Sequence, residues 1–243
     1  MDNLILYSEQ AKRFKEKFEP ELYKPYVVVL DETPLGNCEE TSTHFIIRLC
    51  RTLADESMSA HDANFCHELY HAVQVSKGFP CYTTQNDISD YFIDFLSALR
   101  TVLLDMDVND MLAKENIDCS RFFNDRIGYM WGQCDKGLNE IQNRYDENTF
   151  ALKLLLFYSH TPHKKLKQVK RKMERLNPYI VRCVKDLEGI VGAYGYSTPE
   201  KSFCTLGHFL TYFDLWDGAG IFFDGEVFAS QGVFNKRCAT IRQ

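Results

Sequence analysis

Residues 57–80 read SMSAHDANFCHELYHAVQVSKGFP, and this stretch carries the clearest structural signals in the chain. Ser57 or Ser59 can accept hydrogen bonds from the free N–H groups at the start of a helix, so a helix is predicted over residues 60–77. The Gly-Phe-Pro at 78–80 then supplies a glycine that is typical of helix ends and a proline that cannot continue a helix. The sequence therefore predicts a helix with its own start and stop signals.

The helix carries His67-Glu68-Leu69-Tyr70-His71, a His-Glu-x-x-His motif. Side chains four residues apart lie on one helix face, so both imidazoles can bind the same metal ion. Glu68 can reach a water on that ion without filling the coordination sphere, and it is the predicted general base. Two histidines and one oxygen ligand leave a fourth position open, as in catalytic zinc sites. The alternative is two surface histidines on an amphipathic helix with an incidental glutamate.

The third ligand has to be sought among aspartates. A second helix is expected over residues 87–104, and it contains no glutamate. Asp87, Asp94 and Asp105 share one side of it, flanking its apolar stripe. If the two helices form a tight antiparallel hairpin through a loop, Asp94 lies opposite His71 and Asp105 lies about 16 Å further along. The residues alone leave these candidates open.

The segment HELYHAVQVSKGFP resembles the metal-binding helix of zincin metallopeptidases, and in particular short intracellular HExxH proteins of bacterial regulators and mobile elements. The resemblance covers residues 26–118 and implies a zincin-like core that binds zinc through both histidines of the motif, with its glutamate as base. It extends to D-x-x-V-x-x-x-L after the second helix, where those proteins carry a His or Asp. The resemblance thus favours Asp105 as third ligand and leaves Asp94 as the geometric alternative.

Other residues could assist such a site. A zincin needs a group that stabilises the oxyanion, and Tyr129, Arg126 and His208 are candidates of which none is favoured. Tyr70 points away from both histidines of the motif and is expected in the core. The His-x-x-His at 160–163 borders a Thr-Pro turn and is expected to be a loop pair.

The remaining chain predicts short strands followed mainly by helices. Residues 26–31 are expected to form a strand, 44–49 a strand or the start of a helix, and either could offer an edge on which an extended peptide pairs. Asp-Gly between two apolar triplets predicts a β-hairpin over 221–228. Further helices are expected at 108–113, capped by Asp107, and at 122–133, 139–158, 163–176, 178–194 and 206–215. The fold class is therefore helix-rich α+β, with a zincin-like metal-binding region at 1–135 and a helical region with a C-terminal hairpin at 136–243, packed as one unit.

The composition indicates the class of protein and its cellular compartment. The 243 residues are 45% hydrophobic and 26% charged, which excludes a disordered tail or a fibrous repeat. The nine cysteines are scattered without a CxxC, the first 18 residues lack a secretory signal, and no run reaches 18 apolar residues. A cytoplasmic protein with reduced thiols and no membrane span is predicted.

Charge gives one further pattern. The net charge is −6, but residues 163–175 (HKKLKQVKRKMER) are strongly basic, and apolar side chains at helical spacing predict that one face of this segment packs, Leu176 included. A solvated helix face is the expected reading, and nucleic-acid contact through this helix is the less favoured alternative. Taken together, the sequence favours a zinc-dependent intracellular peptidase acting on a protein or peptide. A non-proteolytic binding or regulatory module on the same scaffold, or an accidental HExxH in a plain helical protein, are the alternatives.

Overall fold

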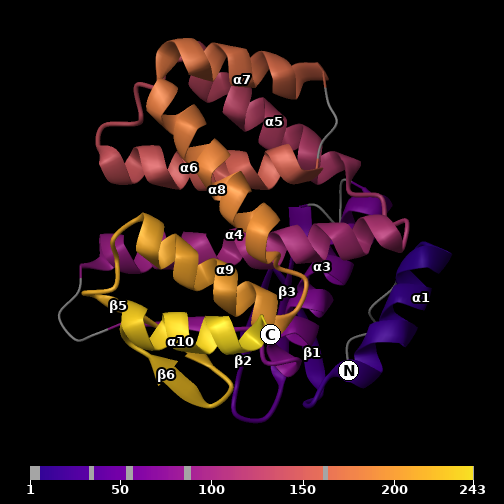
Figure 1. The fold of residues 1–243 in the computed structure, drawn as a ribbon. Coiled ribbons are helices and arrows are strands. Elements are labelled where there is room, and N and C mark those ends of the chain that lie inside the picture. The colour runs from indigo at the N-terminus through magenta and orange to yellow at the C-terminus, as the bar shows by residue number, and fades with distance from the viewer. Residues whose placement is uncertain (1–5, 33–35, 53–56, 85–88, 161–163, 243) are drawn as a thin grey trace. The chain divides into compact units, whose positions relative to one another are not determined.

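The computed structural model describes residues 6–32, 36–52, 57–84, 89–160 and 164–242 (Figure 1). Within them the chain has a helix-rich α+β fold with two small three-stranded sheets and a C-terminal hairpin, which confirms the predicted fold class. The helices and strands in chain order are α1 (Glu9–Phe18), η1 (Glu19–Glu21), β1 (Tyr26–Asp31), β2 (Asn37–Glu40), β3 (Phe45–Cys50), α3 (Met58–Ser76), β4 (Cys81–Thr84), α4 (Asp90–Lys114), α5 (Ser120–Asp135), α6 (Arg144–His160), α7 (Lys164–Leu176), α8 (Pro178–Tyr194), α9 (Pro199–Tyr212), β5 (Ala219–Phe223), β6 (Glu226–Phe228) and α10 (Gln231–Ile241).

Contacts group the chain into two units, one formed by residues 1–77 with 108–124 and the other by 78–107 with 125–243. The dividing line falls inside α4, which is one continuous helix and so belongs to both units. The predicted regions 1–135 and 136–243 stay a prediction. Among the described helices, none combines the length and the hydropathy needed to cross a membrane.

The first unit is built on a sheet with strand order β1-β3-β2, in which β1 runs parallel and β2 antiparallel to the central β3. The segment at 44–49 is thus a strand, because Phe45, Ile47 and Leu49 alternate along it and are fully buried. Helix α3 packs on β3, and its start is capped as predicted, with the Ser57 side chain accepting a hydrogen bond from the Ala60 N–H.

Helix α4 corrects the sequence prediction. The expected break between a helix at 87–104 and a short helix at 108–113 is wrong, because α4 runs unbroken from Asp90 to Lys114. Asp107, the expected cap, is only 4% exposed in the helix interior. No glycine or proline interrupts the segment, so nothing forces the backbone out of the helix there. The expected helix start at residue 87 lies outside the described residues.

The end of α4 is anchored in the first unit. Val108 and Leu112 are buried in the same hydrophobic cluster as Phe65, Leu69 and Val73 of α3. Burial of an aliphatic side chain contributes about 1.5–3 kcal/mol, so this packing holds the last turns of α4 in the core of the first unit. The positions of the residues within one turn before Val108 are fixed by the same packing, because the helix continues through them.

The second unit combines helices with the sheet β4-β5-β6. The predicted hairpin is confirmed: Asp224 and Gly225 connect β5 to β6, both with positive φ, as a type I′ turn requires. The loop expected between the helices at 60–77 and 87–104 contains the strand β4, which pairs with β5. Helix α10 has no counterpart among the predicted elements. Helix α9 also begins earlier than residue 206, because the Thr198 side chain caps it and Pro199 occupies its first turn.

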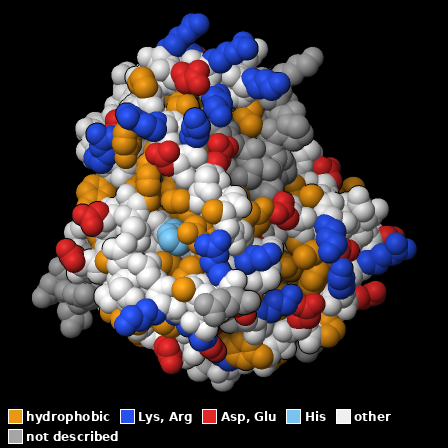
Figure 2. Space-filling view, in the orientation of Figure 1, with side chains coloured by type: hydrophobic (Ala, Val, Ile, Leu, Met, Phe, Trp, Pro, Cys, Tyr) orange, Lys and Arg blue, Asp and Glu red, His pale blue; other side chains and the backbone are white. Residues whose placement is uncertain are grey.

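The basic helix α7 confirms most of its predicted pattern. Val169 and Met173 are buried in the second unit's core, whereas Leu176 is 42% exposed, so the packed face is shorter than expected. Lys and Arg side chains gather over the α7 end of the face seen in Figure 2. Lys172 is engaged within the protein, where it pairs with Asp135 and lies over the Trp131 ring.

Candidate metal centre

The two histidines of the motif converge on one point. The Nε2 atoms of His67 and His71 lie 3.0 Å apart, and the ring planes meet at 80°. Two nitrogens bound to one tetrahedral zinc at about 2.0–2.1 Å each would stand roughly 3.3 Å apart. The pair is thus within a few tenths of an ångström of the spacing that a shared zinc ion requires.

Gln74 contacts the imidazole of His71 on the ring nitrogen that faces away from His67. Its Oε1 lies 2.9 Å from Nδ1 of His71, and its side chain is fully buried. When Nδ1 carries the proton and donates it to this oxygen, Nε2 is left with a free lone pair for a metal. Gln74 was not assigned a role from the sequence, although its position three residues after His71 places it on the same helix face.

Asp105 completes a group of three. One ligand atom each from His67, His71 and Asp105 all lie within 4.8 Å of one another. Asp105 is 5% exposed and stands three residues before Val108 on the continuous α4. It is therefore about 4.5 Å along the helix axis from the segment that packs into the first unit.

The donor set fits zinc. Two imidazole nitrogens and one carboxylate oxygen are the borderline ligands that Zn²⁺ prefers, and a group of three leaves one coordination position open. Manganese or iron also take such ligands, so the donor atoms narrow the metal without naming it. Among the residues that the structure describes, this is the one group of its kind outlined by converging ligand atoms.

Glu68 lies enclosed between the helix and the segment leading into β2. Its side chain is 4% exposed. Gly36 faces it so closely that a Cβ at that position would come within 2.7 Å of Glu68 Oε1 and 2.9 Å of the Arg48 carbonyl oxygen, and closer still to Asn64 Nδ2. Asn64 is itself fixed, since its Oδ1 accepts a hydrogen bond from the Cys50 N–H at 3.1 Å. The carboxylate of Glu68 is thus covered by a main-chain segment that can lie this close only because residue 36 has no side chain.

Two neighbours of the motif belong to the core. Tyr70 is 4% exposed and packs edge-on against Phe14 and Phe18 of α1, which confirms that it points away from the histidines. Cys66 is fully buried, and burial raises the pKa of its thiol far above the ordinary range. Its sulfur is not in the group of ligand atoms that converges with the histidine pair.

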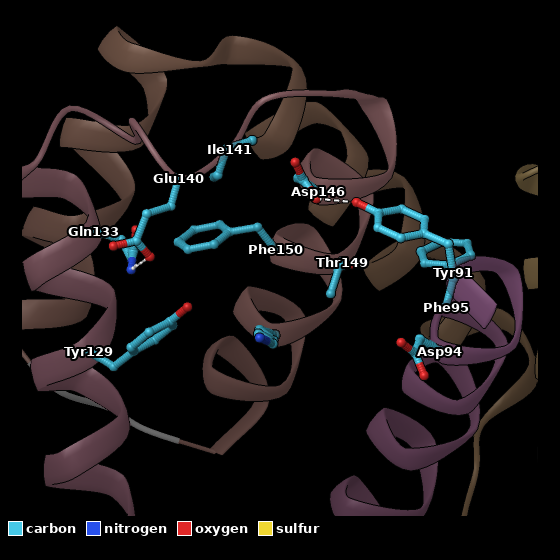
Figure 3. A pocket seen from close by; sticks show the side chains of 11 residues that line it. Tyr91, Asp94, Phe95, Tyr129, Gln133, Glu140, Ile141, Asp146, Thr149 and Phe150 are labelled. Atoms are coloured by element: carbon cyan, nitrogen blue, oxygen red, sulfur yellow. Dashed lines mark hydrogen bonds between the residues drawn. The ribbon is translucent and has the colours of Figure 1, made fainter.

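Asp94, the geometric alternative for the third ligand, lines a different site. It stands on the rim of a pocket of about 290 Å³ in the second unit (Figure 3). The oxyanion candidate Tyr129 lines the same pocket from α5, with the Lys153 ammonium 5.6 Å from its ring. On the opposite wall Tyr91 donates a hydrogen bond to Asp146. Asp94 is not among the described residues whose ligand atoms converge with the histidine pair.

The remaining predicted residues are placed as follows. His208 is stacked on Tyr194 of the second unit, with ring centroids 4.0 Å apart, and burial together with Arg242 lowers the pKa of His208. The side chains of Arg126 and of His160 and residue 163 lie outside the described part of the chain. The oxyanion-stabilising group therefore stays without an assignment.

No model of a known protein family matches the chain, and no curated protein or solved structure matches it either. The metal centre accordingly rests on the geometry of its own residues.

Proposed function

We propose that the chain is a zinc-dependent hydrolase, and specifically an intracellular metallopeptidase with Glu68 as general base. The observation that carries the proposal is the convergence of ligand atoms from His67, His71 and Asp105 within 4.8 Å. A structural zinc site is closed by four protein ligands, whereas three ligands beside a buried carboxylate suit a site that accepts a substrate. The resemblance of the motif to that of zincin metallopeptidases points to peptide bonds as the substrate class.

The residues divide the work as follows. His67, His71 and Asp105 would hold the zinc ion, which would supply Lewis acidity toward a scissile carbonyl and a water. Glu68 takes a proton from the attacking water as its oxygen bonds to the carbonyl carbon. Glu68 then delivers that proton to the amine nitrogen as the carbon–nitrogen bond breaks. Gln74 holds His71 in the tautomer whose Nε2 can coordinate.

The sheet of the first unit offers a place for an extended substrate. Within the described residues β1 pairs with a strand on one side only, and Val27 and Val29 are exposed on it. An extended peptide can add to such an edge through main-chain hydrogen bonds. The alternative segment at 44–49 is excluded for this role, because β3 has a strand on each side.

Metal content is the first test. Purified protein should contain about one zinc per chain by elemental analysis, and His67→Ala/His71→Ala should lose it. His44→Ala is the matched control, because His44 lies in the same unit but bonds to Thr43 in a turn. Native protein that binds no divalent metal after incubation with zinc would refute the centre.

Hydrolysis is the second test. Glu68→Gln removes the base but keeps the shape of a buried side chain, so it should retain zinc and lose cleavage of a peptide library or of the chain itself by about 10²-fold or more. Zinc binding without any hydrolysis by the native protein would favour the alternative, a binding or regulatory module on this scaffold. Equal hydrolysis by Glu68→Gln and native protein would remove Glu68 as the base.

A further inference from the structure

Helices α9 and α10 lie side by side in the second unit (Figure 1). Gly207 of α9 faces Phe234 of α10 so closely that a Cβ at Gly207 would overlap ring atoms of Phe234. Phe234 is fully buried, so its ring fills the space that this glycine leaves free. The two helices are thereby held together in one register.

That register brings two cysteines together. Cys204 precedes Gly207 by three residues and Cys238 follows Phe234 by four, so each cysteine lies one helical turn from the contact on the same helix face. In both contacts, Gly207 with Phe234 and Cys204 with Cys238, a lower residue number on α9 is paired with a higher one on α10. The two helices therefore run antiparallel. The Sγ atoms of Cys204 and Cys238 are 2.8 Å apart.

The geometry is close to that of a covalent bond. A disulfide has a sulfur–sulfur distance of about 2.05 Å, so the two atoms need to approach by roughly 0.8 Å. Both cysteines are buried, at 2% and 5% exposure, within the core that contains the β5–β6 hairpin. A change of this size is within reach of side-chain rotation and a slight shift of the helices.

We propose that Cys204 and Cys238 form an oxidation site, at which a small two-electron oxidant such as hydrogen peroxide produces a disulfide that joins α9 to α10. One sulfur attacks a peroxide oxygen, the oxygen–oxygen bond breaks, and a sulfenic acid and one water form. The second sulfur attacks the first, the sulfur–oxygen bond breaks, and a second water leaves. Two thiols are oxidised by two electrons, and peroxide is reduced to two waters.

The environment sets the speed of this reaction. Burial and the neighbouring Cys238 raise the pKa of the Cys204 thiol, so little thiolate is present at neutral pH. The site therefore oxidises slowly, unlike the exposed low-pKa cysteines of peroxide sensors. Once formed, the bond is shielded from external thiols by the same burial, and it closes a loop that contains the whole hairpin.

Peptide mapping tests the site in the folded protein. Native protein is reduced, treated with hydrogen peroxide, alkylated under denaturing conditions and digested with trypsin, which cuts after Lys201, Lys236, Arg237 and Arg242. Peptides 202–236 and 238–242 contain one of the two cysteines each, and they should appear joined, about 2 Da lighter than their sum, and separate on reduction.

Variants and stability complete the test. Cys204→Ala and Cys238→Ala should not form the joined peptides, whereas Cys134→Ala, a buried cysteine of the same core, should form them like native protein. Oxidised native protein should melt several degrees higher than reduced protein and exchange the amide hydrogens of α10 at least tenfold more slowly. Joined peptides that appear only when oxidation is carried out in denaturant, or cross-links between other cysteines in the folded protein, would overturn the proposal. The mapping uses native protein, so it stands even where a variant fails to fold.

Discussion

Replacement of Gly36 by alanine should disrupt the packing of the main chain over the Glu68 side chain. The added Cβ would meet three groups, of which the Arg48 carbonyl is main chain of the central strand. The Asn64 amide is tied to the Cys50 N–H, and Glu68 is buried beneath. None of the three can swing away freely, so the segment at Gly36 has to move outward.

The expected magnitude follows from this crowding. One methyl group forced into a well-packed site costs about 1–3 kcal/mol of unfolding free energy. For a chain of this length, 1 kcal/mol corresponds to about 2–4 °C, so Gly36→Ala should lower Tm by roughly 2–12 °C. On the proposed function, Gly36→Ala should still bind zinc, because Glu68 is not a predicted ligand. Hydrolysis should fall, because the carboxylate no longer rests in its native position.

Gly189→Ala is the matched control. Gly189 lies inside α8, and a Cβ there would meet no heavy atom within 4 Å beyond the neighbours in its own helix. Alanine favours the helix over glycine by roughly 0.5–1 kcal/mol, so this variant should be slightly more stable than native protein. Thermal unfolding followed by circular dichroism compares the two. A Gly36→Ala variant that melts within about 1 °C of native protein would show that the segment before β2 is not seated on Glu68.

Four further variants test the candidate metal centre and the start of α1. Gln74→Ala removes the hydrogen-bond partner of the second imidazole, so zinc affinity measured by competition with a chelating dye should fall by about 10–100-fold. Asp105→Ala should weaken zinc binding strongly in the same assay while Asp94→Ala leaves it unchanged, and the reverse order would reinstate the hairpin geometry. Asp62→Ala leaves two backbone N–H groups at the start of α1 without their carboxylate acceptor, so urea denaturation should show a loss of about 2–4 kcal/mol. A loss below 0.5 kcal/mol in that last variant would mean that water replaces the carboxylate there.

Local signals in the sequence were sufficient for much of the fold. The capped α3, the Asp-Gly hairpin and helix α8 depend on contacts between near neighbours in the chain, and these are visible as spacing and turn residues. Strand β1 pairs with the more distant β3, but its run of three valines is a strand signal in itself. Helix α9 had such a signal too, in Thr198 followed by Pro199, but the apolar spacing that begins at residue 206 concealed it. Strands β2 and β4 have no signal of their own, because each is only four residues long and is defined by its partner strand.

In the candidate site, too, some residues could be predicted from local spacing and others depend on tertiary packing. His67, Glu68 and His71 are set by one helix period, so their shared face could be read from spacing alone. The enclosure of Glu68 by Gly36 and the meeting of Cys204 with Cys238 could not, because each joins segments about thirty residues apart through tertiary packing. A lone glycine after Pro-Leu reads as part of a turn, and nothing in its neighbours indicates which side chain it will cover.

The choice between Asp94 and Asp105 turns on the continuity of α4. A hairpin model measures register from the loop that joins two helices, and from that end Asp94 falls opposite His71. The helix is instead anchored by its far end, where Val108 and Leu112 are buried in the core cluster of the first unit. Register counted from that anchor brings Asp105, three residues away, next to the histidines. The missed continuity of the helix between residues 104 and 108 also explains why spacing alone left the third ligand open, since a break before Asp107 separates Asp105 from the buried turns that follow it.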